Sequence, residues 1–83
     1  MSGKQPVEVE AERFRGGRLL PRAFLWLGRR VVIRSWGRDW DEADGRHLLV
    51  MAESGRVFEL VHRPGAWALV DRPTIFPPPS AAA

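Results

Sequence analysis

The stretch that decides the fold runs from residue 47 to residue 62 and reads HLLVMAESGRVFELVH. We expect two strands there, at residues 47–53 and 56–62, because Ser54-Gly55 is a two-residue turn signal between two apolar runs. Glu53 and Arg56 would then face each other with opposite charges across the turn. The register that follows pairs Met51 with Phe58, Leu49 with Leu60 and His47 with His62.

The first of these strands is apolar on both of its faces. One face carries Leu48, Val50 and Ala52, and the other carries Leu49 and Met51. A flat sheet would leave one of these faces in water, whereas a sheet that curls on itself buries more of both and protects its edges. We therefore predict an all-β fold, a small partly closed antiparallel barrel that is SH3-like or OB-like. An open sheet that dimerises through its second face is the alternative.

Four further segments have the pattern of strands, which makes about six short antiparallel strands. Residues 6–14 alternate apolar side chains with glutamates through Glu12. The other three segments span residues 21–27, 30–36 and 67–71. Gly28-Arg29 suits a type II′ turn, which would pair Trp26 with Val31 and Phe24 with Ile33. We expect residues 37–45, the longest polar stretch between strands, to form a loop.

The chain of 83 residues has room for one domain at most. We place a single small β-barrel domain at residues 6–72, after a flexible N-terminus at residues 1–5. Residues 73–83 are rich in proline and alanine, and we expect them to form a disordered tail. A partner-binding motif in the segment Ile75-Phe76-Pro77-Pro78-Pro79 is the alternative.

Several classes of protein are excluded by what the composition lacks. The chain has no cysteine, which rules out disulfides, thiolate nucleophiles and cysteine-ligated zinc. No apolar run approaches the roughly 18 residues of a transmembrane helix, and the N-terminus does not have the pattern of a signal peptide. We therefore expect a cytoplasmic protein with no membrane contact, no cofactor and no small-molecule substrate.

Charge is segregated along the chain, although the net charge is only +3. Between residues 13 and 38 there are eight arginines and no acid, and residues 39–44 then hold four acids and no base. Such a basic block is typical of an electrostatic footprint for nucleic acid. The alternative is a solvated face whose arginines pair with the glutamates before the block and the acids after it.

The candidate nucleic-acid-binding residues all lie in or beside this basic block. Arg15, Arg18, Arg29 and Arg30 would contact phosphates, because guanidinium groups bind phosphate in a bidentate way. Trp36 and Trp40 would stack on bases beside Arg34 and Arg38. The alternatives are that the arginines are ordinary solvated loop residues and that the tryptophans cover a barrel end.

No arrangement of residues predicts an enzyme. The expected pairing of His47 with His62 is the only candidate for acid–base chemistry, and no Ser/His/Asp set accompanies it. A metal site would need a third ligand, for which Asp44 is the only nearby candidate, and the spacing matches no zinc signature. We expect no catalytic residues and no metal.

Four segments, Pro21–Arg30, Trp36 with Trp40, Gly55–Leu60 and Trp67–Leu69, together resemble a bacterial family of small domains of unknown function. Members look alike in a Pro-x-x-Phe-x-Trp-x-Gly-Arg segment, one or two loop tryptophans, a Gly-Arg hairpin and a final Trp-x-Leu strand. The resemblance covers roughly residues 6–72. This chain departs from the family at Leu48-Leu49, where an aromatic pair is usual, and it has no tyrosine.

The resemblance has a functional implication, because similar domains occur as standalone proteins and at the C-terminus of proteins related to Y-family translesion DNA polymerases. With the basic block, it leads us to expect a non-enzymatic accessory domain that binds single-stranded or duplex nucleic acid weakly in a DNA repair or replication-associated assembly. The alternative is a protein–protein interaction or structural module without nucleic-acid contact. The acidic stretch and the modest net charge favour that alternative.

Overall fold

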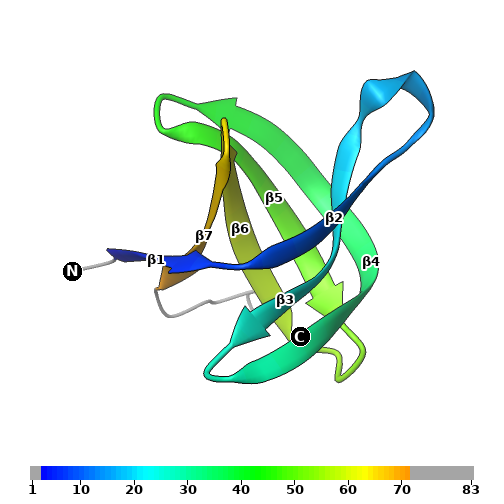
Figure 1. Ribbon diagram of the computed structural model, residues 1–83, viewed down its shortest axis with the longest axis vertical. Coiled ribbons are helices and arrows are strands. Elements are labelled where there is room, and N and C mark those ends of the chain that lie inside the picture. The colour runs from blue at the N-terminus through cyan, green and yellow to red at the C-terminus, as the bar shows by residue number, and fades with distance from the viewer. Residues whose placement is uncertain (1–2, 72–83) are drawn as a thin grey trace, which may run out of the picture.

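The computed structural model describes residues 3–71, and this part of the chain is built almost entirely from strands (Figure 1). The short 3-10 turn η1 (Arg15–Gly17) is its only helical element. No helix within residues 3–71 is long and apolar enough to cross a membrane. The strands are β1 (Gly3–Val7), β2 (Val9–Arg13), β3 (Leu19–Trp26), β4 (Arg29–Glu42), β5 (Gly45–Ala52), β6 (Val57–Arg63) and β7 (Ala66–Asp71).

All neighbouring strands are antiparallel, in the order β1-β7-β6-β5-β4-β3-β2. The two outermost strands, β1 and β2, follow each other in the chain and are separated only by Glu8. The N-terminal segment therefore pairs with β7 through its first half and with β3 through its second half, and the sheet curls into a half-barrel (Figure 1). The prediction of an all-β, partly closed antiparallel barrel is confirmed.

The described strands number seven rather than about six, because the N-terminal segment is divided at Glu8. Strand β1 begins at Gly3, three residues before the boundary that we expected at residue 6. The expected disordered tail at residues 73–83 lies outside the described residues.

The core lies on the inner face of the curled sheet. Phe24 and Phe58 pack edge to face, with ring centroids 5.1 Å apart, and Trp26 packs against the same Phe58 ring at 5.2 Å. Apolar burial of this kind is the main favourable contribution to folding. The buried core cluster comprises Phe24, Ile33, Leu48, Val50, Ala52, Phe58, Leu60 and Leu69.

The register predicted for the β5–β6 hairpin is wrong by one residue. The turn contains three residues, Glu53-Ser54-Gly55, and the Gly55 amide donates to the Ala52 carbonyl at 2.8 Å. Gly55 has a φ of 93°, which fits a type I turn closed by a glycine bulge. Because the side-chain period is two, this single extra residue changes every cross-strand partner. His47 therefore lies opposite Val61 rather than His62.

The predicted turn between β3 and β4 is also wrong. Leu27-Gly28 forms the turn instead of Gly28-Arg29, so Trp26 pairs with Arg29 and Phe24 pairs with Val31. Leu27 has a φ of 53° and Gly28 a φ of 76°. A positive φ at both central positions is the mark of a type I′ turn, whose twist matches the flanking strands. This turn places the glycine second, whereas the predicted type II′ turn placed it first.

The loop predicted at residues 37–45 is a hairpin. Strand β4 continues to Glu42, and the chain turns through Ala43-Asp44 into β5. The pairing of β4 with β5 shifts between Ile33 and Ser35 and again between Trp36 and Asp39. Such bulges bend a strand, so this 14-residue strand can follow the curl of the sheet. The sequence suggested a loop because residues 37–45 are the longest polar stretch between the expected strands.

Candidate functional site

The basic block is partly neutralised by the acids on either side of it, since three of its eight arginines form ion pairs. Arg30 donates from Nε and Nη2 to the two carboxylate oxygens of Glu10, at 2.7 and 2.8 Å. Arg18 forms an ion pair with Asp39. Both arginines are candidate phosphate contacts, and each now has a carboxylate partner from a distant part of the chain.

Two further ion pairs extend this neutralisation. Arg22 pairs with Glu12 at 3.1 Å. The guanidinium of Arg46, on β5, donates to both carboxylate oxygens of Asp39, at 3.0 and 2.7 Å. The hydrogen bonds from Arg46, and then from Arg18, lower the pKa of Asp39 although its partial burial opposes them. The bidentate hydrogen bond from Arg30 likewise lowers the pKa of Glu10.

Within the described part of the chain, three arginine side chains of the block make no hydrogen bond, ion pair or ring contact, namely those of Arg15, Arg29 and Arg34. They do not form one patch. Arg15 lies in η1, before the start of β3, and Arg29 begins β4, after the end of β3. The eight-residue strand β3 separates them, so these two segments lie at opposite ends of the molecule (Figure 1).

Both candidate stacking tryptophans are engaged inside the domain. Trp36 is half-buried, and its Nε1 donates to the Pro21 carbonyl at 2.7 Å. The Nε1 of Trp40 donates to Glu42 at 2.7 Å, and its ring stacks on His47 with centroids 5.3 Å apart. The guanidinium of Arg38 lies 4.9 Å from the Trp40 ring centroid. Whether the candidate residues bind nucleic acid stays a prediction.

His47 stands at the centre of a cluster that the sequence did not reveal. The imidazole is only 4% exposed. Its Nδ1 lies 2.6 Å from the Glu59 carboxylate, and its Nε2 lies 2.7 Å from Asp44 and 3.6 Å from Glu42. Asp44 in turn forms an ion pair with Lys4 from β1. Four strands and one turn thus contribute to a single polar cluster, which is covered on one side by the Trp40 ring.

The hydrogen bonds and charges within the cluster shift the pKa values of its residues toward the charged forms. Burial lowers the pKa of His47, but the hydrogen bonds to Asp44 and Glu59 outweigh this effect and raise it. The hydrogen bond to His47, together with the Lys4 ammonium, holds the pKa of Asp44 well below its usual range. His62 behaves in the opposite way, since burial and the nearby Arg46 lower its pKa. The two histidines therefore have different surroundings and no direct partnership.

Residue 45 must be a glycine for the hairpin that carries this cluster to lie against β6. Gly45 has a φ of 139°, and a side chain there would place its Cβ 2.7 Å from the His62 carbonyl oxygen. Asp44, at the spacing i, i+3 from His47, was visible as a nearby ligand candidate in the sequence. Glu59 was not, because its approach to His47 depends on the register of β5 against β6.

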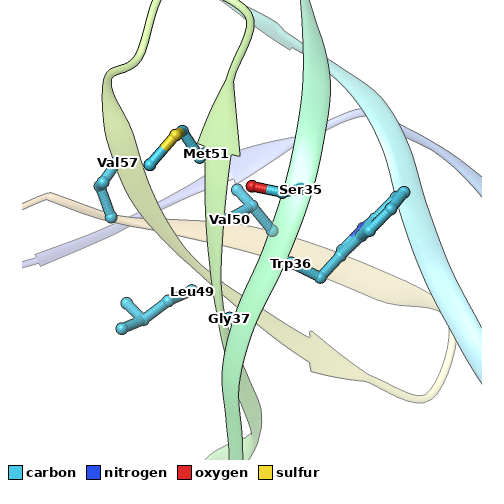
Figure 2. Close-up of a pocket in the computed structure, with 7 residues that line it drawn as sticks. All are labelled: Ser35, Trp36, Gly37, Leu49, Val50, Met51 and Val57. Carbon is cyan, nitrogen blue, oxygen red and sulfur yellow. The ribbon is translucent and has the colours of Figure 1, made fainter.

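A second feature is an apolar groove on the outer face of the sheet (Figure 2). It has a volume of about 370 Å³ and runs over β4, β5 and β6. The side chains of Leu49, Met51 and Val57 lie along one side of it, and Ser35 and Gly37 of β4 adjoin it (Figure 2). Met51 is more than one-third exposed, so this strip is open to a partner.

No family model, no curated protein and no solved structure matches this chain. The resemblance to the bacterial family, and the finer assignment as SH3-like or OB-like, therefore stay predictions.

Proposed function

We propose that this domain is a non-enzymatic protein-interaction module whose groove over β4, β5 and β6 binds an extended segment of a partner protein. The segment would carry apolar side chains with acidic residues beside them. One observation carries this proposal, namely an open apolar groove in which the outward-facing Leu49, Met51 and Val57 continue into Val50 of the core cluster and into Trp36, which packs against that cluster (Figure 2). Exposed apolar surface that forms a connected patch is a usual mark of a docking site.

The groove lies over the middle of the sheet. Strand β5, which supplies Leu49 and Met51, is hydrogen-bonded to β4 on one side and to β6 on the other. Its backbone groups are therefore already used, and a partner cannot add a strand there. Recognition would rest on side chains that fill the groove, with small Ser35 and Gly37 leaving room on the β4 side.

The charges around the groove favour an acidic partner. Arg34 and Arg38 flank the lining segment Ser35–Gly37 on β4, and the guanidinium of Arg38 lies over the Trp40 ring. Arg56 precedes Val57, but its guanidinium lies over the rings of Trp26 and Phe58. Arg34 has no partner in the described residues. The seven lining residues include no acid. The nearest acid in β6, Glu59, is buried and hydrogen-bonded to His47. An acidic segment would thus meet positive potential at the edge of the groove.

The test begins with selection of random peptides displayed on phage against the immobilised protein. Enriched peptides are then synthesised with a fluorescent label and titrated by anisotropy. We expect enrichment of apolar peptides with acidic flanks and micromolar dissociation constants. Leu49→Asp should weaken their binding at least about tenfold, since a central contact of an interface commonly contributes more than 1 kcal/mol.

Leu25→Asp is the matched control, because Leu25 is an exposed apolar residue on β3 outside the groove. Met51→Asp gives a second groove variant in case Leu49→Asp does not fold, which circular dichroism would show. If the selection enriches no peptide, or if the groove variants bind as well as the wild type, the proposal is wrong. A separate titration uses labelled oligonucleotides. Binding to them that weakens with salt would favour the nucleic-acid function instead.

A further inference from the structure

We propose that Glu42, Asp44 and His47 form a binding site for one divalent transition-metal ion, for which Zn²⁺ is the best match. This site is separate from the proposed protein-binding groove and does not depend on it. It departs from our expectation, based on the sequence, that the chain holds no metal.

The three ligand atoms converge on one point. The Nε2 of His47, Oδ1 of Asp44 and Oε1 of Glu42 all lie within 4.8 Å of one another. Tetrahedral Zn²⁺ with bonds of about 2.0 Å holds its ligand atoms roughly 3.3 Å apart. On binding Zn²⁺, the distance between His47 and Asp44 would lengthen slightly from 2.7 Å, and the distance between His47 and Glu42 would shorten slightly from 3.6 Å. One imidazole and two carboxylates are ordinary zinc ligands and leave a fourth position open.

Each ligand is oriented by a residue outside the ligand set. Glu59, on β6, binds the Nδ1 of His47 at 2.6 Å. The ammonium of Lys4, on β1, pairs with Oδ2 of Asp44. The indole of Trp40 donates to Oε2 of Glu42 at 2.7 Å. In all three cases one atom of the ligand is held and the other is directed to the common point, which is how outer partners prepare metal sites.

The charge of the cluster also suits a divalent cation. The carboxylates of Glu42, Asp44 and Glu59 surround the imidazole of His47. They outnumber by one the two cations beside them, which are Lys4, paired with Asp44, and Arg63, whose Nε donates to the Asp44 carbonyl at 2.8 Å. Residual charge is costly near buried groups such as the imidazole.

The proposed metal site is covered on one side by the protein and open to solvent on the other. The Trp40 ring covers His47 and keeps water from one side of the site. The side chain of Glu42 is 53% exposed, so an ion can enter from that side. The hairpin turn that carries Asp44 is held against β6 by a hydrogen bond of 2.8 Å from Nε of Arg63 to the Asp44 carbonyl.

The experiment is isothermal titration of the full chain with ZnCl₂, together with Co²⁺ absorption spectra to report the coordination geometry. We expect one ion per chain and a tetrahedral Co²⁺ spectrum. Glu42→Gln, Asp44→Asn and His47→Gln should each weaken binding at least about tenfold. Glu59→Gln, which changes a positioning residue, should weaken it by about 10–100-fold while keeping the tetrahedral spectrum.

His62→Gln is the matched control, because His62 is the other of the two histidines in the chain. This variant should bind Zn²⁺ like the wild type. Because Glu42 is exposed, Glu42→Gln keeps the test valid if the His47 variant does not fold. No binding at millimolar Zn²⁺ would overturn the proposal and leave the cluster as an ion-pair network only. Binding that persists unchanged in all three ligand variants would also overturn it.

Discussion

Glu59 and His47 form a hydrogen bond of 2.6 Å on the outer face of the sheet, and both side chains are more than nine-tenths buried there. A charged pair in this position is costly to bury but more costly to break. The pair ties β5 to β6 next to the apolar groove. Removal of one partner should therefore destabilise the domain. The hydrogen bond also holds the ring of His47 in place at the cluster.

Replacing Glu59 by Gln tests the stabilising role of this pair. The variant keeps the size of the side chain but removes its charge, so the buried Nδ1 of His47 loses its carboxylate partner while Nε2 keeps Asp44. We expect the free energy of unfolding to fall by about 1–3 kcal/mol in urea denaturation. Glu53→Gln, an exposed glutamate in the β5–β6 turn, should change it by less than about 0.5 kcal/mol. Equal effects of the two changes would contradict the structural role.

Acidification should weaken the fold partly through Asp39. Its pKa in the folded protein lies below its ordinary value of 3.8 because Arg46, and then Arg18, donate to the carboxylate. The contribution of Asp39 is therefore fully present above the unfolded pKa and is lost as the pH falls through the lower folded pKa.

Denaturation series in urea from about pH 5 to about pH 2 would measure this loss. Asp39→Asn should lose less stability over that range than the wild type, because its amide does not titrate. Asp41→Asn, an exposed acid two residues along β4, is the control and should follow the wild type. A wild-type profile in Asp39→Asn would show that this ion pair contributes nothing.

The type I′ turn at Leu27-Gly28 holds a leucine in an unfavourable conformation. Leu27 has a φ of 53°, and its side chain is 77% exposed, so it gains little from burial. Asparagine adopts positive φ more readily and is preferred at this position before glycine. We expect Leu27→Asn to raise the free energy of unfolding by about 0.5–1 kcal/mol. Leu27→Ala keeps the strain and should leave stability nearly unchanged in the same urea titration.

Phe24 should be among the most sensitive positions of the core. It is fully buried and packs edge to face on Phe58. Phe24→Ala should lower the free energy of unfolding by about 3–5 kcal/mol, because it removes apolar burial and leaves a cavity. In Leu25→Ala, at the adjacent and exposed position, we expect a change below about 1 kcal/mol. A small effect at Phe24 in thermal or urea unfolding would mean that the barrel is packed differently.

Binding to oligonucleotides should depend only weakly on salt. Each phosphate neutralised on duplex DNA contributes about −0.9 to the slope of log K against log salt. Six free arginines acting together would give a slope near −5. Arg15, Arg29 and Arg34 do not form one patch, so only one of them at a time should contact a phosphate, and the slope should be about −1. Fluorescence anisotropy at several salt concentrations measures this slope. A value near −5 that flattens in Arg29→Ala with Arg30→Ala would instead support the nucleic-acid interface.

The class of fold could be predicted from the sequence because alternation is a local property. The two apolar faces of residues 48–52 led us to expect a sheet that closes on itself. The curled sheet buries Leu48, Val50 and Ala52, whereas Leu49 and Met51 stay partly exposed on its outer face. The turns were harder to predict. Ser54-Gly55 fits both a two-residue and a three-residue turn, and the difference of one residue replaces His62 by Val61 opposite His47.

The sequence by itself determined that the chain is all-β, where most of the strands lie, and that its charges fall in opposed blocks. Only the tertiary structure decided which charges meet. The pairing of Arg30 with Glu10 and of His47 with Glu59 joins residues 20 and 12 positions apart, through strand registers that depend on turn conformation and on bulges. The physical reason is that side-chain alternation is a local property of each strand. Contacts across a curled sheet, by contrast, are set by the packing of the whole barrel.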